Sequence, residues 1–398
     1  MITFIHAADL HLDTPFSGLE QISKKLANKL RDAPYESLAA LVDQALEHQV
    51  DFVLIAGDIY NTKRVNIKAQ SLFVDQMKRL EQANIAVFMI RGNHDFLTTE
   101  DKALKLPLPE NVYTYSADVQ THVLKTKNNE RVAISGFSYE TQWGFDRKVT
   151  DYPTRRSDVN LHIGMLHGSL DGTEASYAPF SLQELRQKNY DYWALGHIHQ
   201  RQELAPNIHY PGNIQGLHKN ETGPKGALLV EWTPQAQEIT FLPTAPIIWE
   251  SLAVDITDVE NVGELFETLR GEMETLGDTD EVLVHLTLRA TVHENEQLLQ
   301  LIQEPEFNEQ LTKQLNLPNI WIASVTFLLE KEDDRQSLQG LYPEMWANAI
   351  DKAFEKEMLE EITAGIFNQI PSKYLNETNT KVYREELLAK AIAKIYMK

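Results

Sequence analysis

The sequence predicts an α/β layered fold in which a second sheet packs on the first. Three short apolar runs, at residues 2–9, 51–58 and 85–93, read as buried strands. Between them, residues 35–50 and 67–84 carry apolar side chains at helical spacing, which predicts two helices. This β-α-β-α-β order is typical of a parallel sheet with crossover helices. After residue 110 the pattern changes to strands and turns, including a predicted hairpin over residues 121–139, and this change indicates the second sheet.

The amino-acid composition limits which kinds of functional site the chain can have and where in the cell it is expected. The chain has 398 residues, enough for two or three domains, and no cysteine, which excludes disulfides, thiolate zinc sites and cysteine nucleophiles. Its start resembles no signal peptide, and no apolar run approaches the roughly 18 residues of a membrane span. We therefore expect a cytoplasmic protein with no membrane association. The net charge is −21, of which residues 1–250 carry −6 and residues 251–398 carry −15, so any nucleic-acid contact is expected in the first 250 residues.

The chain is predicted to contain three parts. Residues 1–245 hold the layered fold, and two prolines in the stretch FLPTAPIIWE at 241–250 indicate a boundary. Residues 250–332 read as a small α+β domain. Residues 338–398 form a C-terminal helical region, because large apolar residues recur every fourth position from Trp346 to Ile366 and again from Tyr383 to Ile395.

The predicted strands of the first part end in polar residues of the types that bind metal ions. The stretch YWALGHIHQR ends an apolar run with two histidines, and four other runs end in the same manner. Ligands gather at the carboxyl ends of parallel strands, because the loops there converge on one edge of the sheet. The candidate ligands are Asp9, His11, Asp58, Asn93, His167, His197 and His199.

Seven ligands suit a pair of divalent cations. If one carboxylate bridges, seven residues supply eight ligand positions, four for each metal. Asp58 is the natural bridge, because Gly57 permits close approach and a carboxylate has two oxygens. Two cations held about 3.5–4 Å apart clamp the attacking and leaving oxygens of a phosphoryl displacement. With only two aspartates against two cations, the loaded site is electropositive and suits a phosphodiester.

The series Asp-x-His, Gly-Asp, Gly-Asn-His-Asp, His-Gly and Gly-His-x-His resembles that of calcineurin-like metallophosphoesterases over residues 1–245. The stretches HAADLHLD and YPGNIQG resemble its DNA-repair exonuclease branch, of the SbcD and YhaO type. The resemblance implies a four-layer α/β/β/α sandwich, a small α+β capping domain over 250–332, and two divalent metal ions, with manganese expected. It implies that Asp9, His11, Asp58 and His199 hold one ion and that Asp58, Asn93, His167 and His197 hold the other.

The same resemblance implies catalytic roles for two further residues. His94 is expected to act at the leaving group or on the charge of the transition state, and Asp95 is expected to orient it. An imidazolium there can donate a proton to the departing 3′ oxygen. One departure from the branch's pattern is Asn61, where many such nucleases have His or Asp, which puts the substrate contacts there in doubt.

The predicted function is a metal-dependent DNA exonuclease in repair or end processing. The resemblance implies DNA as substrate, a homodimer, and an SbcC-type coiled-coil ATPase held by a helix-loop-helix at 338–398. Two alternatives remain open at this point: a phosphodiesterase or phosphatase for small substrates, and a DNA-end scaffold without catalytic activity. The extra 150 residues and the YPGNIQG stretch favour the nuclease, because enzymes for small substrates need no second domain.

Overall fold

The computed structural model describes residues 1–14, 24–61, 66–97, 106–144, 146–171, 177–276, 281–291, 296–302, 304 and 307–330, with positions 345 and 348. The chain divides into two compact units, the first comprising Met1–Glu250 with Thr279–Leu283, and the second Ser251–Asp278 with Val284–Lys398. The predicted helices at 338–398 lie outside the described residues, apart from those two positions. No helix in the described ranges combines the length and the apolar character that crossing a bilayer requires.

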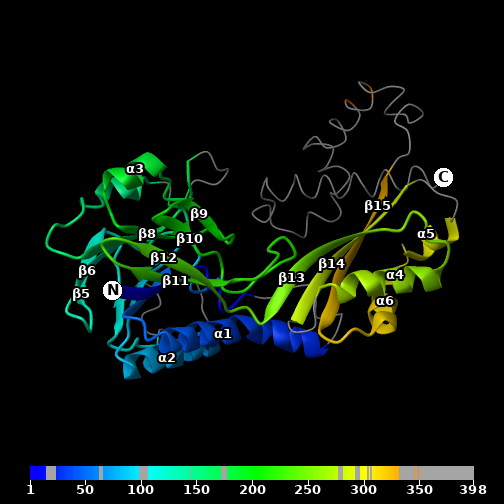
Figure 1. Cartoon of the computed structure of the whole chain (residues 1–398), viewed down its shortest axis with the longest axis horizontal. Helices are drawn as coiled ribbons and strands as arrows, with labels where there is room; N and C mark the ends of the chain where they lie inside the picture. Colours follow the sequence, from blue (N-terminus) through cyan, green and yellow to red (C-terminus); the bar gives the residue numbers. More distant parts are fainter. Residues whose placement is uncertain are drawn as a thin grey trace. The chain divides into compact units, whose positions relative to one another are not determined.

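Two six-stranded sheets form the first unit (Figure 1). The first sheet has the order β12 (Gln237–Pro243), β11 (Gly226–Trp232), β1 (Ile2–Ala7), β2 (Phe52–Ala56), β3 (Ala86–Ile90) and β4 (Val112–Thr114). The second has the order β5 (Gln120–Lys125), β6 (Arg131–Gly136), β7 (Leu161–His167), β8 (Tyr192–Gly196), β10 (Ile208–Tyr210) and β9 (Gln202–Ala205). Strands β1, β2 and β3 run parallel, as do β6, β7 and β8.

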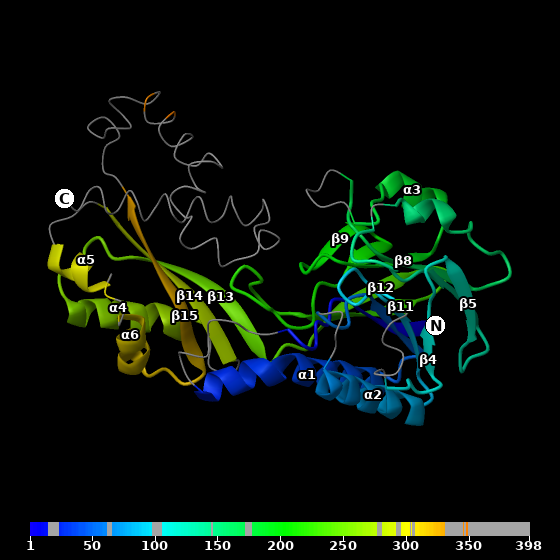
Figure 2. The same cartoon turned by 180° about the vertical axis from the view of Figure 1, so that it is seen from behind.

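The two sheets pack face to face, and helices cover their outer faces. Alternate residues of a strand point to opposite faces, so Val53 and Ile55 of β2 pack against helices α1 (Lys24–Glu47) and α2 (Ile67–Gln82). Phe52 and Leu54 point the other way, into the core between the sheets. There Phe52 stacks on Phe4 of β1, with ring centroids 5.0 Å apart. Helices α1 and α2 lie side by side under the first sheet in both views (Figure 2).

The outer face of the second sheet carries shorter helices. Trp193 and Leu195 of β8 pack with Leu185 of α3 (Leu182–Gln187) and with the 3₁₀ helix η2 (Lys148–Asp151). Helix α3 begins at a capping box, in which the Ser181 hydroxyl accepts a hydrogen bond from the Glu184 backbone. The order of layers is therefore helices, sheet, sheet and helices, which confirms the predicted four-layer α/β/β/α sandwich.

The second unit contains most of a three-stranded sheet with the order β13 (Ile247–Asp255), β14 (Glu281–Thr291) and β15 (Ile320–Glu330). Its helices are α4 (Val262–Glu274), α5 (Glu296–Ile302) and α6 (Phe307–Leu315). Leu265, Leu269 and Met273 line the buried face of α4 at helical spacing. The Asn261 side chain caps α4 by accepting a hydrogen bond from the Glu264 backbone at 3.1 Å.

Candidate metal centre

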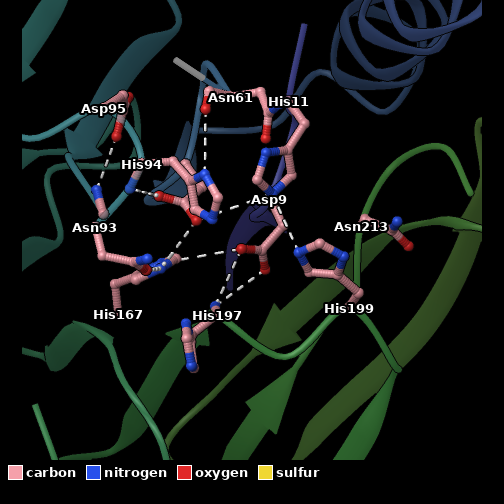
Figure 3. A network of polar contacts seen from close by, with 12 residues as sticks. Asp9, His11, Asn61, Asn93, His94, Asp95, His167, His197, His199 and Asn213 are labelled. Atoms are coloured by element: carbon pink, nitrogen blue, oxygen red, sulfur yellow. Dashed lines mark hydrogen bonds and ion pairs between the residues drawn. The ribbon is translucent and has the colours of Figure 1, made fainter. Parts of the chain in front are cut away.

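Five parallel strands of the two facing sheets bring their carboxyl ends to one place. Asp9 follows β1, Asp58 follows β2, and Asn93 follows β3. From the other sheet, His167 is the last residue of β7, and His197 follows β8. Figure 3 labels Asp9, Asn93, His167 and His197 among these residues. The loops hold one another directly, because the Asp9 amide donates to the Gly57 carbonyl and the His197 amide donates to the Asp9 carboxylate, each at 3.1 Å.

The backbone of these loops is unusual in a manner that serves close packing. Asp9, His11 and Asp58 have left-handed φ angles of 52°, 45° and 51°. Gly92 leaves the space that the site needs, since a Cβ at this position would lie 2.1 Å from Asp58 Oδ1 and 2.7 Å from His167 Nε2. Because Gly92 has no side chain, the donor atoms of Asp58 and His167 can occupy the centre.

The first group of donor atoms comes from Asp9, His11 and His199. Their ligand atoms all lie within 4.8 Å of one another. The Nε2 atoms of His11 and His199 are 3.1 Å apart. His199 Nδ1 lies 2.5 Å from Glu221 Oε1, and because a carboxylate accepts, Nδ1 carries the proton and Nε2 of a neutral His199 offers a lone pair. His11 Nδ1 is buried without a hydrogen-bond partner among the described residues.

The second group comes from Asp9, Asp58 and His167. His167 Nδ1 donates to the Ala56 carbonyl at 2.9 Å, so its Nε2 is the atom that faces the centre. This Nε2 lies 3.3 Å from Asp58 Oδ2 and 3.1 Å from Asn93 Oδ1. Asp58 Oδ2 is also 3.8 Å from His11 Nε2, a nitrogen of the first group. The residue that the two groups share is Asp9.

These donors fit a divalent cation. Nitrogen and oxygen atoms converge from several directions in a buried space, and the side chains of Asp9, Asp58 and His167 are each at most 2% exposed. Carboxylate, amide and imidazole ligands together are a set that first-row divalent metals accept. Uncompensated negative charge in such a space is unfavourable, so the space favours a positive charge, whether a proton or a metal ion.

The pKa values of the site reflect two opposing effects, burial and the charges of neighbouring side chains. Burial raises the pKa of Asp9 to about 6. Burial alone would lower the pKa of His167, but the neighbouring Asp58 carboxylate raises it to about 9. For Asp58 itself, burial acts to raise the pKa, and the imidazoles of His167 and His11 more than offset this, so the net pKa lies below its ordinary value. With no cation bound, a proton on His167 therefore balances the carboxylate charge at neutral pH.

Five of the seven predicted ligands belong to these two groups, and a sixth, Asn93, contacts His167 of the second group. The seventh, His197, is placed differently. The His197 ring is in neither group and lies beside the rings of His167 and Tyr177, with centroids 5.3 and 5.0 Å away. In Figure 3 this ring points away from Asp9, although its backbone amide holds the Asp9 carboxylate. The His197 side chain would have to turn before its ring could share a cation with His167 Nε2.

The structure also gives His94 another partner than the predicted one. His94 Nδ1 lies 3.1 Å from the carbonyl oxygen of Asn61, and its backbone amide donates to Asp58 Oδ1 at 3.0 Å. The Asp95 carboxylate instead accepts from the backbone amides of Gly92 and Ile59. Asp95 thus fastens the loop after β3 to the loop after β2, and Asn61 orients the His94 ring through its main chain.

Comparisons with known proteins agree with this geometry. The family model for calcineurin-like phosphoesterases matches residues 2–201, which include all seven candidate ligands. The chain belongs to the calcineurin-like phosphoesterase family. It is 37% identical over 325 residues to the uncharacterized metallophosphoesterase YhaO of Bacillus subtilis, which covers 78% of this chain and 79% of that protein.

More distant relatives carry the name DNA double-strand break repair protein Mre11. That of Methanocaldococcus jannaschii is 26% identical over 275 residues, 66% of this chain and 71% of that protein. That of Saccharolobus solfataricus is 24% identical over 385 residues, 91% of this chain and 90% of that protein. At the level of the family, the relatives therefore support the DNA-repair branch of the metallophosphoesterases.

One residue of this metallophosphoesterase site is missing from the sequence-based prediction. Glu221 is 7% exposed, and its carboxylate accepts hydrogen bonds from His199, from the Asn213 side chain at 2.8 Å and from the Leu217 amide at 2.6 Å. Burial acts to raise the pKa of Glu221, and the bond to His199 lowers it to about 2. Glu221 belongs to no motif, and only its place five residues after the YPGNIQG stretch could have indicated a role.

Proposed function

We propose that this metallophosphoesterase is a DNA exonuclease that hydrolyses phosphodiester bonds in DNA repair or end processing. The observation that carries the proposal is the convergence of buried oxygen and nitrogen donors in two groups that share Asp9. Two adjacent cations suit a phosphodiester, because they can neutralise the charge on both the attacking and the leaving oxygen. The Mre11 relatives, matched over as much as 91% of the chain, favour DNA over a small ester.

The cations would be held by the seven candidate ligands, with Asp58 bridging, and we propose manganese. When bound, they supply electrostatic stabilisation of the charge that develops on the phosphoryl oxygens. His94 supplies a proton. Because its Nδ1 faces the Asn61 carbonyl, its Nε2 is left to donate to the departing 3′ oxygen.

Hydrolysis of three substrates with manganese tests the proposal: a linear DNA duplex, single-stranded DNA and bis-p-nitrophenyl phosphate. We expect nucleotides to be released from the ends of at least one DNA substrate, and chelation to abolish the reaction. Activity on the small ester but on neither DNA, even with the ATPase present, would identify a small-substrate phosphodiesterase. Binding to DNA ends without hydrolysis of any substrate would identify a scaffold.

We further propose that residues 338–398 bind an SbcC-type coiled-coil ATPase and that the protein works as a homodimer. The apolar side chains that recur every fourth residue from Trp346 to Ile366 would form one helix face that such a partner can cover. Truncation after Glu332 should leave the basal nuclease activity and abolish co-purification with the ATPase. Co-purification at the level of the full chain would refute this assignment, and light scattering measures the dimer.

A further inference from the structure

We propose that a cavity at one edge of the first unit binds a nucleoside monophosphate whose base carries an amino group. The cavity shares no residue with the candidate metal ligands. The proposal stands without the nuclease function proposed above, although an exonuclease that breaks the bond to a 3′ oxygen releases molecules of this class. Residues that line the cavity fit both ends of such a ligand, the phosphate and the base.

The cavity lies at an open edge between the two sheets. At this edge β11 and β12 of the first sheet lie across from β10 and β9 of the second (Figure 1). The inner faces form an apolar core at the middle of the sandwich, but at the edge Ile239 and Phe241 are only partly buried. The wall opposite them is largely polar and includes Arg201, Glu203 and His209. The cavity has a volume of about 700 Å³, which is within the range of small-molecule sites.

Arg201 supplies a cation for the phosphate. Its guanidinium carbon lies 3.7 Å from the centroid of the Phe241 ring, so one face of the group is stacked on the aromatic ring. No hydrogen bond or ion pair joins the Arg201 side chain to any residue in the described ranges. Stacking leaves the N–H bonds at the edge of a guanidinium able to donate, and their paired geometry matches a phosphate. The held but unpaired guanidinium therefore favours an anionic group in this cavity.

His209 and Glu203 supply hydrogen-bond acceptors for the base. The two residues are paired across β10 and β9 at a bulge in the register. His209 Nε2 donates to the Pro206 carbonyl at 2.9 Å, so Nδ1 has the lone pair, and no residue that the structure describes donates to it. Burial lowers the pKa of His209, which keeps the ring neutral at pH 7. An imidazole nitrogen and a carboxylate suit the amino groups of guanine, adenine or cytosine better than the carbonyl groups of thymine.

The remaining walls suit a flat ring and are held in place. The first sheet lines the cavity with Leu228, Ile239 and Phe241. The His209 ring is stacked on Tyr192, with centroids 5.6 Å apart. Gln237 Nε2 donates to the Pro206 carbonyl at 2.8 Å and so ties the first sheet to the second beside the cavity. Because these walls are fixed before a ligand arrives, little side-chain entropy is lost on binding.

The test measures binding of dGMP to the full-length protein by titration calorimetry with a chelator present. Without metal, the buried carboxylates of the metal centre disfavour a phosphate, so the heat reports on the cavity. We expect Arg201→Ala to weaken dGMP binding about 10- to 100-fold, the usual effect of losing hydrogen bonds to a charged group, and Arg201→Lys to restore part of it. Deoxyguanosine, which has no phosphate, should bind the wild type and Arg201→Ala alike. Arg186→Ala removes an exposed arginine of α3 and is the matched control, which should keep the wild-type affinity.

Two further variants test the place of the base. Ile239→Trp puts a large ring into the cavity and should abolish binding of both dGMP and deoxyguanosine, with the circular-dichroism spectrum of the wild type. Glu203→Ala should remove the preference for dGMP over dTMP. If Glu203 only repelled the phosphate, Glu203→Ala would bind both nucleotides more tightly, and this result would refute the proposed recognition of the base.

A comparison of dGMP with GMP separates two sources of the ligand. Tighter binding of dGMP would assign the cavity to a product of DNA hydrolysis, and tighter binding of GMP to a free ribonucleotide, and both results support a nucleoside monophosphate site. No saturable binding of dGMP, or binding that Arg201→Ala and Ile239→Trp leave unchanged, would overturn the proposal and leave the nuclease function intact. Displacement of dGMP by an equal concentration of inorganic phosphate would also overturn it, because the base would then contribute nothing.

Discussion

The Nε2 atoms of His11 and His199 face each other at 3.1 Å, although the two residues are 188 positions apart in the sequence. Glu221 accepts a hydrogen bond from His199 Nδ1, so the lone pair of a neutral His199 is on Nε2, which faces His11. A carboxylate in this place fixes the tautomer of a histidine ligand and strengthens it. We therefore expect Glu221→Gln to weaken metal binding about 10- to 100-fold, measured by titration calorimetry with manganese.

The control for this prediction is Glu203→Gln, because Glu203 is an exposed glutamate on β9. It should bind manganese like the wild type. Wild-type affinity in Glu221→Gln would mean that the hydrogen bond to His199 does not affect ligation.

Asp58→Ala should lose metal. Asp58 Oδ2 lies 3.3 Å from His167 Nε2 and 3.8 Å from His11 Nε2. If Asp58 bridges as proposed, its removal takes a ligand from both cations. We expect the metal content, measured by mass spectrometry after gel filtration, to fall from two ions to fewer than one per chain. Asp158→Ala removes an exposed carboxylate paired with Arg156 and serves as the control. Full occupancy in Asp58→Ala would contradict the bridging role.

His94→Ala should separate chemistry from metal binding. His94 is half-buried, and its ring centroid lies 5.1 Å from that of His11, but it is in neither group of donor atoms. We expect kcat on DNA to fall about 10²- to 10⁴-fold, the usual contribution of a general acid, with an unchanged metal content. His48→Ala, an exposed histidine next to the end of α1, is the control. A variant that keeps its kcat would show that another group donates the proton.

Metal binding should release protons and strengthen as the pH rises. His167, with a pKa raised to about 9, carries a proton at pH 7 that a cation must displace, and Asp9, with a pKa of about 6, adds a smaller fraction. Burial lowers the pKa of His11 and His197 to about 3, so these two release none. Burial acts to lower the pKa of His199, but the hydrogen bond to Glu221 more than offsets this and raises it, so His199 adds a further fraction. Calorimetry at pH 7 in buffers of different ionisation enthalpy should therefore report release of about one to two protons. A binding heat independent of the buffer would refute this assignment.

The fold was predictable where periodicity is strong. The runs in β1, β2 and β3 alternate or are wholly apolar, and the predicted hairpin appears as β5 and β6, with Lys125 opposite Arg131. The start of α1 was not predictable. The helical pattern is clear only from residue 35, whereas α1 begins at Lys24 and contains Pro34. A proline normally ends or kinks a helix, so local sequence argues against this continuation, and packing decides it.

The candidate site was predictable in its residues and less so in its contacts. Short motifs identify Asp9, Asp58 and His167, because each follows or ends a buried strand. The motifs do not give the direction in which a side chain points. For this reason the sequence did not predict that the His197 ring points away from Asp9, or that the Asp95 carboxylate binds backbone amides instead of His94. Glu221 reaches His199 only through the tertiary fold, and no local pattern distinguishes it from other glutamates.

The left-handed backbone at Asp9, His11 and Asp58 has a consequence for engineering of this protein. Each such residue costs about 1–2 kcal/mol relative to a glycine in the same conformation. Libraries selected for heat resistance alone should therefore enrich glycine or asparagine at these positions and accumulate inactive, robust variants. A screen for heat-resistant variants of the enzyme needs an activity assay in every round, because thermal stability and activity favour different amino acids at these three positions.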